Sequence, residues 1–307
     1  MHTLPTVTVG IPAHNEEQNI ASMISSVLKQ KGNFKLERIL VVCDGCNDRT
    51  AEIVKKMARS HSVIKLLNDG KRLGKAQRLN QIYAKNTSDF LGTFDADIAL
   101  ERTCELDHMV KEMTKHPETM VVAGNLKPVA ADTIVGKMSV ISFLSFQDAI
   151  LRLNGGNNYY SLVGCASLVR GSFAKTFSYP KEVVSDMNYL YTLATVKHPL
   201  GVRLARDTRF LFRTVNTLHD WRVLAVRSVA EDKNNLVSYF GPEVLNEYHM
   251  PLWLSVSSLV KWLFKSPLYA SGSILMNIFV RLFPLSELKP KHGIWEDARS
   301  SKAAITT

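Results

Sequence analysis

Residues 6–28 read TVTVGIPAHNEEQNIASMISSVL, which is the pattern of a strand, a polar loop and a helix in immediate succession. The β-branched run Thr6–Ile11 predicts a strand that ends at Pro12, and apolar residues at helical spacing follow the loop. The same pattern returns where the strand-like run Arg38–Cys43 leads through a turn into the helical spacing of Thr50–Ala58. Strands that alternate with helices at these intervals predict βαβ units, and therefore a mainly parallel central sheet flanked by helices.

Further along, the apolar run Phe90–Phe94 predicts another strand, and it leads directly into two acidic residues. Before it we expect a strand at Val63–Leu67 and a helix at Lys75–Ala84. Sheets of this kind bind their ligands beyond the carboxyl ends of the strands. We therefore expect one shared rim for the three polar clusters that follow strands, namely His14-Asn15-Glu16, Asp44-Gly45 and Asp95-Ala96-Asp97.

The second half of the chain has a less regular pattern. It predicts a strand at Met120–Ala123, a long apolar helix at Val135–Leu153 and a strand or turn at Gly164–Arg170. After Thr217 the spacing becomes helical and more apolar. The last ten residues, ARSSKAAITT, are polar and predict a frayed or disordered end.

The composition limits the classes of function. The chain has 307 residues and is 46% hydrophobic, so it can bury a large core. Lys and Arg number 38 against 28 Asp and Glu, and the net charge of +10 favours anionic partners. The basic residues are dispersed and form no recognisable nucleic-acid-binding module, so nucleic acid is not an expected partner. Four scattered cysteines do not suit the disulfide framework of a small secreted domain, and the amino terminus lacks a signal-type apolar run. We therefore expect a cytoplasmic protein.

The stretch Pro251–Phe283 is rich in aromatic and apolar residues but is interrupted by Lys261, Lys265 and Arg281. These charges make it a poor candidate for a membrane span. Two interpretations stay open: the stretch lies in a membrane interface, or it is buried against the domain or a second copy of the chain. The first would place the protein peripherally on the cytoplasmic face of a membrane.

Asp95 and Asp97 can present two carboxylates on one side of a tight turn. Such a pair suits a hard divalent cation, Mg²⁺ or Mn²⁺, that bridges two phosphate oxygens. A cation placed there would neutralise a departing diphosphate. Taken alone, two acids after a strand are also typical of a solvated turn or a helix cap.

The context of this pair resembles the family 2 inverting glycosyltransferases. The resemblance rests on four segments in order, VTVGIPAHNEEQNI, VVCDGCNDRTAEIV, GKRLGKAQRLNQIY and FLGTFDADI, and extends over about residues 6–200. It implies the A-type glycosyltransferase fold, also called the nucleotide-diphospho-sugar transferase fold. The implied reaction is metal-dependent, inverting transfer of a sugar from a nucleoside-diphosphate sugar to an acceptor hydroxyl, on a lipid-linked or cell-envelope glycan.

The resemblance also implies a domain organisation. A glycosyltransferase catalytic domain would occupy residues 1–215, with the nucleotide-binding half at 1–100 and the acceptor half at 101–215. A helical carboxyl-terminal region would follow at residues 216–307.

Residue roles follow from the resemblance in the same way. The loop from Pro12 to Glu16 would line the base and ribose of the donor, and Asp44 would lie near the base. Asp186 would deprotonate the acceptor hydroxyl, while Asp95 and Asp97 would hold the cation. The expected donor-binding residues are Pro12, Ala13, Asn15, Glu16, Asp44, Lys75, Asp95 and Arg222.

The chain departs from the family pattern at several positions. A single acid precedes Gly45, and Ser185 stands where an acid often precedes the base. Residues 217–222 lack the Gln-x-x-Arg-Trp motif of processive members, which argues against a long-chain polysaccharide synthase. The pair Cys43 and Cys46 has no second pair to complete a zinc site, so we interpret Cys43 as a packing residue.

Two alternatives to a glycosyltransferase remain open from sequence. The first is a non-catalytic nucleotide-sugar-binding or membrane scaffold protein, which the departures around Asp44 and Asp186 suggest. The second is a sugar nucleotidylyltransferase, although the glycine-rich basic loop that is usual near the amino terminus of that class is missing.

Overall fold

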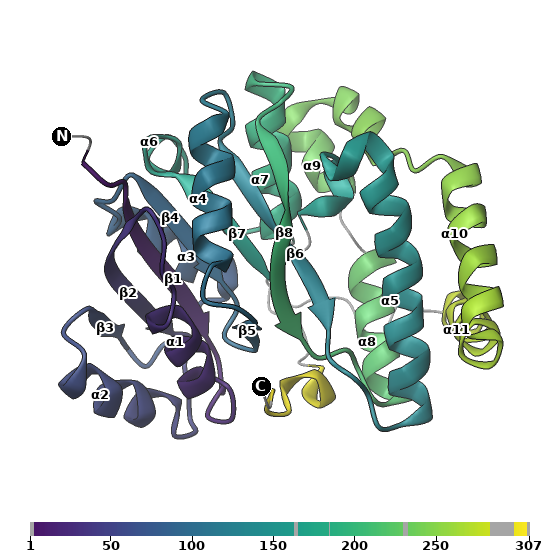
Figure 1. The fold of residues 1–307 in the computed structure, drawn as a ribbon, viewed down its shortest axis with the longest axis horizontal. Coiled ribbons are helices and arrows are strands. Elements are labelled where there is room, and N and C mark those ends of the chain that lie inside the picture. Colours follow the sequence, from purple (N-terminus) through teal and green to yellow (C-terminus); the bar gives the residue numbers. More distant parts are fainter. Residues whose placement is uncertain (1–2, 163–164, 184, 230–232, 283–297, 306–307) are drawn as a thin grey trace.

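A computed structural model describes residues 3–162, 165–183, 185–229, 233–282 and 298–305. Gly164 and Phe283, which bound two of the segments expected above, lie outside the described residues. Eight strands form one sheet in the order β3-β2-β1-β4-β7-β6-β8-β5 within these ranges (Figure 1). The strands are β1 (Thr6–Ala13), β2 (Lys35–Cys43), β3 (Ile64–Leu67), β4 (Phe90–Phe94), β5 (Ile98–Leu100), β6 (Val121–Pro128), β7 (Ala166–Arg170) and β8 (Val202–Phe212).

The half of the sheet formed by β1 to β4 is parallel, as expected: β1 pairs with β2 and β4, and β2 pairs with β3. β1 continues through Pro12 to Ala13, two residues beyond the expected run Thr6–Ile11. A proline is tolerated there because β1 pairs with β4 only as far as Gly10, so one side of the strand is unpaired at Pro12. This extension sets where the first polar loop begins.

The other half of the sheet is mixed. β7 runs antiparallel to both β4 and β6, β6 is parallel to β8, and β5 is antiparallel to β8. The expected α/β class with a mostly parallel sheet is confirmed. The short strand β5 and the long strand β8 were not among the expected elements.

Helices cover both faces of the sheet. On one face α1, α2 and α4 share a hydrophobic cluster with β1, β2 and β4, and on the other α3 and α7 share a second cluster with residues of β2, β4, β6 and β8. The helices, with their 3-10 turns, are α1 (Ile20–Leu28), α2 (Thr50–Ser60), α3 (Lys75–Ala84), α4 (Glu105–Lys115), α5 (Ile134–Arg152), η1 (Leu153–Gly156), η2 (Tyr159–Ser161), α6 (Gly171–Ala174), α7 (Asp186–Lys197), α8 (Leu218–Val229), α9 (Lys233–Phe240), η3 (Pro242–Tyr248), α10 (Leu252–Lys265), α11 (Pro267–Leu282) and η5 (Arg299–Lys302).

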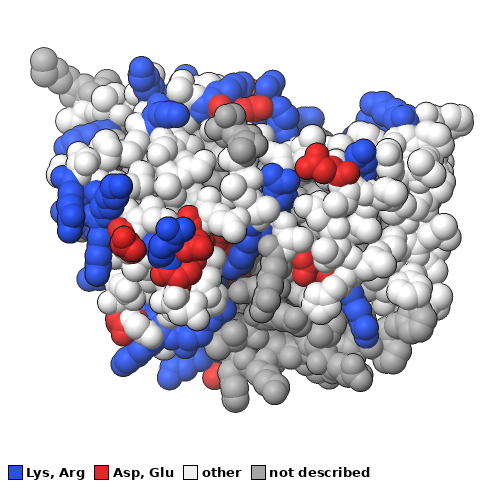
Figure 2. All heavy atoms as spheres, turned by 90° about the horizontal axis from the view of Figure 1, so that it is seen from below, with Lys and Arg blue, Asp and Glu red and all other residues white. Residues whose placement is uncertain are grey.

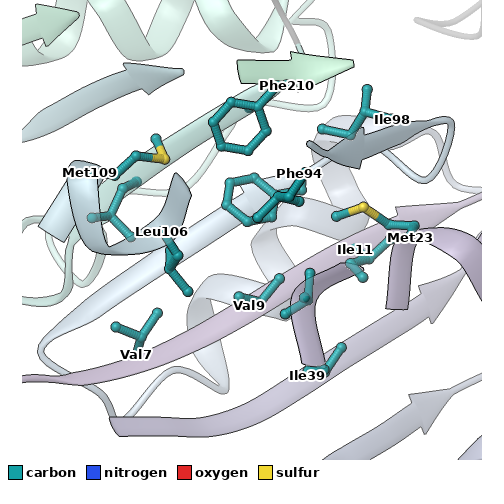
Figure 3. Close-up of a cluster of buried hydrophobic side chains, with 14 of the residues drawn as sticks. Val7, Val9, Ile11, Met23, Ile39, Phe94, Ile98, Leu106, Met109 and Phe210 are labelled. Carbon is teal, nitrogen blue, oxygen red and sulfur yellow. The ribbon is translucent and has the colours of Figure 1, made fainter. Parts of the chain in front are cut away.

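The core beneath α1 and α4 shows why β4 is fixed in place. Val7, Val9 and Ile11 alternate along β1 and point into this core, as a period of two requires (Figure 3). The rings of Phe94 and Phe210 lie in the same cluster with their centroids 5.3 Å apart. Phe94, the last residue of β4, is 1% exposed, so the chain leaves the core immediately before Asp95.

The helical carboxyl-terminal region is confirmed as a set of helices beside the sheet. α10 and α11 pack on α5, with Ser258 on α10 donating a 2.8 Å hydrogen bond to Asp148 on α5 (Figure 1). The stretch Ile134–Gly156, made of α5 and η1, is the one span in the described residues with the length and composition to cross a membrane. A core helix can have the same properties, so this composition alone assigns no membrane span.

Candidate functional site

The three polar clusters share one rim, as predicted. β1 ends at Ala13, β2 at Cys43 and β4 at Phe94, and these parallel strands end on the same edge of the sheet. Figure 1 shows this edge at the bottom, and Figure 2 views the molecule from that side, where acidic and basic side chains gather. The start of α3 and the start of α7 bring two further charged residues, Lys75 and Asp186, to the same place.

Lys75 joins the predicted metal-binding and base residues. Its Nζ lies 2.8 Å from Asp95 Oδ1 and 3.5 Å from Asp186 Oδ2. Although burial by itself would lower it, the two carboxylates raise the pKa of Lys75 well above its ordinary value. Three residues from separate parts of the sequence therefore form one charged cluster.

The cluster contains more acid than this lysine balances. Burial and repulsion from Asp97 and Asp186 raise the pKa of Asp95 to about 7, although Lys75 opposes the shift. Burial and repulsion from Asp97 also raise the pKa of Glu16 to about 8. Crowded carboxyl groups of this kind fit a divalent cation, because a cation relieves both effects. No group of three or more His, Cys, Asp or Glu within the described ranges is arranged to hold a metal, so phosphate and water oxygens would have to complete the coordination of a cation at Asp95 and Asp97.

The donor loop is held by its own polar contacts. Asn15 adopts a left-handed conformation with φ of 52°, and its Oδ1 accepts a 2.9 Å hydrogen bond from the backbone of Asn47. The backbone N–H of Glu16 donates to Thr50 Oγ1 at 2.8 Å. Pro12 and Ala13 belong to the end of β1 itself. The loop after β1 is thereby tied to the loop after β2.

Asp44 organises the loop that carries Lys75. Its carboxylate accepts hydrogen bonds from the backbone N–H groups of Leu73, at 2.6 Å, and Gly74, at 3.1 Å. The buried guanidinium of Arg78 donates to the same carboxylate at 3.0 Å. Gly74 has φ of 87°, a conformation that a glycine adopts without strain. The expected contact of Asp44 with a nucleotide base stays a prediction.

Asp186 is the first residue of α7, and Ser185 is its N-cap, with the Oγ accepting a 3.3 Å hydrogen bond from the N–H of Asn188. The segment before α7 is fastened to α3 by Asn80, whose Oδ1 accepts from the N–H of Tyr179 at 2.7 Å and whose Nδ2 donates to the Tyr179 carbonyl at 2.9 Å. This pair of bonds sets the distance between the helix that begins with Lys75 and the one that begins with Asp186.

A model of the protein family described as "Glycosyl transferase family 2" matches residues 8–177, which is more than half of the chain. The chain belongs to glycosyl transferase family 2. A member of this family transfers a sugar from a nucleotide-sugar donor, and the match spans every predicted donor residue except Arg222.

Two curated relatives of this family 2 glycosyltransferase are similar over part of their length. A poly-β-1,6-N-acetyl-D-glucosamine synthase of Staphylococcus aureus (strain COL) is 26% identical over 186 residues, 61% of this chain and 42% of that protein. The synthase of Staphylococcus epidermidis is 25% identical over 179 residues, 58% of this chain and 40% of that protein. The chain thus spans about two fifths of the length of these relatives.

Solved structures share the fold at low identity. The mannosyltransferase PcManGT from Pyrobaculum calidifontis, in complex with GDP-Man and Mn²⁺, has a TM-score of 0.60 and 18% identity, and the similarity covers 92% of this chain and 82% of that one. The glucosyl-3-phosphoglycerate synthase of Mycobacterium tuberculosis, in complex with Mn²⁺, UDP and phosphoglyceric acid, has a TM-score of 0.51 and 15% identity, covering 76% and 78% of the two chains. These similarities confirm the A-type glycosyltransferase fold.

Arg222 is the expected donor residue that lies outside the family match, in the carboxyl-terminal half of the chain. It is half-buried on α8, next to Trp221, which is 5% exposed in a core with Val215, Val223 and Val280. Trp221 is therefore a core residue, as the helical spacing predicted. The role of Arg222 at the donor stays a prediction.

All four cysteines of this glycosyltransferase are free thiols, with Cys43 at the end of β2 and Cys46 in the loop that follows. Cys43 is fully buried at the end of β2, in agreement with its interpretation as a packing residue. Cys46 donates to the carbonyl of Ala13 at 3.3 Å, and its hydrogen bond with Cys43 lowers the pKa of Cys46 to about 7. Burial and the nearby aspartates keep the pKa of Cys165 well above its ordinary value, so this thiol stays protonated beside Asp95.

Sequence reasoning missed the carboxyl-terminal segment at this site. The prediction of a frayed end is wrong for residues 298–305, which are folded against the donor loop. Lys302 Nζ lies 3.0 Å from Glu16 Oε1 and donates to the carbonyl of His14 at 2.8 Å. The polar composition of the segment suggested an unfolded end. Sequence patterns did not show the contact because its partners lie almost three hundred residues earlier in the chain.

Proposed function

We propose that this family 2 enzyme catalyses metal-dependent, inverting transfer of a sugar from a nucleoside-diphosphate sugar to an acceptor hydroxyl. The observation that supports it most is the position of Lys75 between Asp95 and Asp186. In this proposal Lys75 contacts the donor diphosphate, Asp95 and Asp97 hold Mg²⁺ or Mn²⁺, and Asp186 is the general base.

Asp186 has the surroundings that a base needs. Its Oδ2 is buried and accepts no hydrogen bond from the described residues, so a lone pair is available for an incoming hydroxyl. The ammonium of Lys75 lies 3.5 Å from this same oxygen, within ion-pair distance. As the hydroxyl oxygen attacks the anomeric carbon, Asp186 takes its proton and the bond to the diphosphate oxygen breaks, which inverts the anomeric configuration.

The leaving group becomes more negative during this step. Lys75 stabilises it through a fixed positive charge in a partly buried site, where electrostatic interactions are stronger than in water. A divalent cation held by Asp95 and Asp97 would supply further stabilisation of the diphosphate. Two structural neighbours are complexes with Mn²⁺, which supports this choice of cation.

The donor would enter along the loop between β1 and α1. Pro12, Ala13, Asn15 and Glu16 would contact the nucleoside, with Asp44 and the loop before Lys75 forming the opposite side. The neighbours carry a GDP-linked sugar in one case and UDP in the other. A panel of both nucleotides is therefore the appropriate starting point.

For the acceptor, we propose a lipid-linked or cell-envelope glycan that the enzyme meets at a membrane surface. The inner faces of α10 and α11 pack on α5, while their outer faces expose large apolar side chains. Residues 252–282 contain Lys261 and Lys265 but no acidic residue, which favours an anionic lipid surface over a mixed-charge protein partner. Figure 2 shows the corresponding right-hand edge as largely uncharged. The exposed side chains are Leu252, Trp253, Val256, Leu259, Val260, Phe264, Leu268, Leu275, Ile278, Phe279 and Leu282.

The activity test is release of nucleoside diphosphate from UDP-, GDP- and dTDP-sugars with Mn²⁺ or Mg²⁺, in the presence of membrane lipid extract as the acceptor source. Asp97→Ala and Asp186→Asn should each reduce release by about 10²–10⁴-fold. Asp132→Ala, which changes an exposed aspartate outside the cluster, is the matched control. Full activity in Asp186→Asn would show that another residue is the base. Release of pyrophosphate would indicate nucleotidyl transfer. Binding of a nucleotide sugar without turnover would indicate a scaffold protein.

Vesicle flotation tests the membrane surface separately. Phe264 is 86% exposed on α10, so Phe264→Glu should reduce binding to vesicles that contain anionic lipid. Leu4→Glu likewise replaces an exposed apolar side chain with an acid, far from α10, and should bind as the wild type does. Equal binding of the two variants would refute membrane binding through α10 and α11.

A further inference from the structure

The carboxyl-terminal segment 298–305 reaches the donor loop through one side chain and one backbone group. Lys302 contacts Glu16 Oε1 at 3.0 Å and the carbonyl of His14 at 2.8 Å. The carbonyl of Lys302 accepts a 2.7 Å hydrogen bond from Asn19 Nδ2, at the residue before α1. The segment therefore spans the loop from its first residue to its last.

Apolar contacts anchor the segment at both of its ends. Ala298 is 5% exposed in the cluster that contains Trp221, and Ile305 is 6% exposed against Ala99 and Leu211. A segment held on both sides of Lys302 loses little additional conformational freedom when the donor binds.

Polar contacts to the segment come from the end of β8 and from α8. The N–H of Ser300 donates to Asp220 Oδ2 at 2.8 Å, and Ser300 Oγ accepts from the N–H of Asn216 at 2.9 Å. Arg213 donates to the carbonyl of Ala304 at 2.9 Å. These bonds lie on both sides of Lys302 along the chain, so its ammonium is aimed at the loop by a fixed backbone.

The ammonium of Lys302 contacts the carboxyl group of Glu16. Its side chain is 6% exposed, and Asp97 lies close enough to repel it. A carboxylate buried at this level needs a charge partner, and Lys302 provides a hydrogen-bonded one. Lys75 thus pairs with Asp95 and Asp186 on one side of the site, and Lys302 pairs with Glu16 on the other.

We infer that Lys302 is a positioning residue of the donor site, which holds Glu16 and the loop from His14 to Glu16 in the conformation that binds a nucleoside diphosphate. The inference rests on the proposed function, in which this loop contacts the nucleoside. Residues 298–305 would therefore act as part of the catalytic domain, although about two hundred residues separate them from the donor motifs.

Calorimetry with UDP and GDP, each in the presence of Mn²⁺ and again in EDTA, tests the inference. Lys302→Met should weaken nucleoside-diphosphate affinity by about tenfold, the loss expected when one charge-assisted contact no longer orders the loop. Lys302→Arg should recover most of that loss, because guanidinium can pair with the same carboxylate. Lys56→Met, at an exposed position on α2, is the matched control and should bind as the wild type does.

Kinetics separates positioning from simple destabilisation. Lys302→Met should raise the donor KM with kcat at saturation changed by less than about threefold, since only donor binding depends on the loop. Unchanged affinity in Lys302→Met would overturn the inference, and tighter binding would show that the segment obstructs the site instead. An equal loss in the Met and Arg variants, with a lower melting temperature in both, would assign a purely structural role. A wild-type protein that binds none of the nucleotides would overturn the proposed function itself.

Discussion

Replacing Arg78 with methionine should destabilise the protein and weaken donor binding together. The Arg78 side chain is 1% exposed, and its Nε donates to Asp44 Oδ1 at 3.0 Å. Its other nitrogens donate to both oxygens of Asp69, at 3.0 and 2.8 Å, and to the carbonyl of Lys71. One guanidinium therefore fastens the loop before α3 to α3 itself, and that loop sets the position of Lys75.

The magnitude follows from the burial of the two acids. Asp44 keeps 6% of its side-chain exposure, so Arg78→Met leaves a buried carboxylate without its main partner, a change that costs about 3–5 kcal/mol. We expect the lower end, about 3 kcal/mol, because Arg72 lies 3.4 Å from Asp44 and two backbone N–H groups remain. Asp69 is 41% exposed and can be solvated by water, so its lost contact adds little.

Urea denaturation followed by circular dichroism measures this loss. Asp69→Asn removes the exposed half of the network only, so its midpoint should stay close to that of the wild type. Adding Asp44→Asn to Arg78→Met should recover part of the stability, because it neutralises the orphaned charge. Nucleoside-diphosphate affinity, measured on the folded variants, should fall in Arg78→Met more than in Asp69→Asn.

Equal urea midpoints for Arg78→Met and Asp69→Asn would refute a stabilising role of the Arg78–Asp44 pair. A double variant less stable than the sum of its single changes predicts would show that Asp44 is not the group that Arg78 compensates. Normal donor affinity in a destabilised Arg78→Met would separate stability from the placement of Lys75.

Further predictions concern the charges and the geometry of the site. Burial raises the pKa of Asp95 to about 7 and that of Glu16 to about 8, so the stability that these acids contribute is complete below about pH 4 and is lost as the pH rises to about 8. Mn²⁺ should therefore raise the melting temperature more at about pH 8 than at about pH 6, and an equal rise at both would contradict the assignment. Lys75→Met should lower kcat/KM by about 10²–10³-fold, with Lys75→Arg less affected, as nucleoside-diphosphate release would measure. Asn80→Ala breaks both bonds to Tyr179 and should lower kcat by about tenfold with donor affinity retained, because it loosens the position of the base rather than of the nucleotide.

Local patterns predicted the elements that build the first half of the sheet. The helix Lys75–Ala84 and the strand Phe90–Phe94 have the boundaries that the sequence indicated. Both are defined by short-range signals, which are a glycine before the helix and a run of buried apolar residues in the strand. The three loops that follow β1, β2 and β4 could be placed on one rim for the same reason.

The features that the sequence did not predict depend on contacts between residues that are distant in the chain. Arg78 occupies the third position after Lys75 on α3 and resembles any basic residue on a solvated helix face. Its burial is favourable because it pairs with Asp44, which follows β2, and with Asp69. Strand β8 shows the same limit, because its exposed positions alternate irregularly where its register with β6 shifts near Gly124.

The charge balance of the site indicates how metal and donor should depend on each other. Four carboxyl groups, from Glu16, Asp95, Asp97 and Asp186, face the ammonium groups of Lys75 and Lys302, and both lysines are already paired. A diphosphate adds further negative charge, so its approach is unfavourable until a divalent cation restores the balance. In the proposed site Asp95 and Asp97 would hold the cation, and the diphosphate and water would supply its remaining oxygens. Each ligand therefore improves the site for the other, and by linkage the affinity gained by the donor equals that gained by the cation.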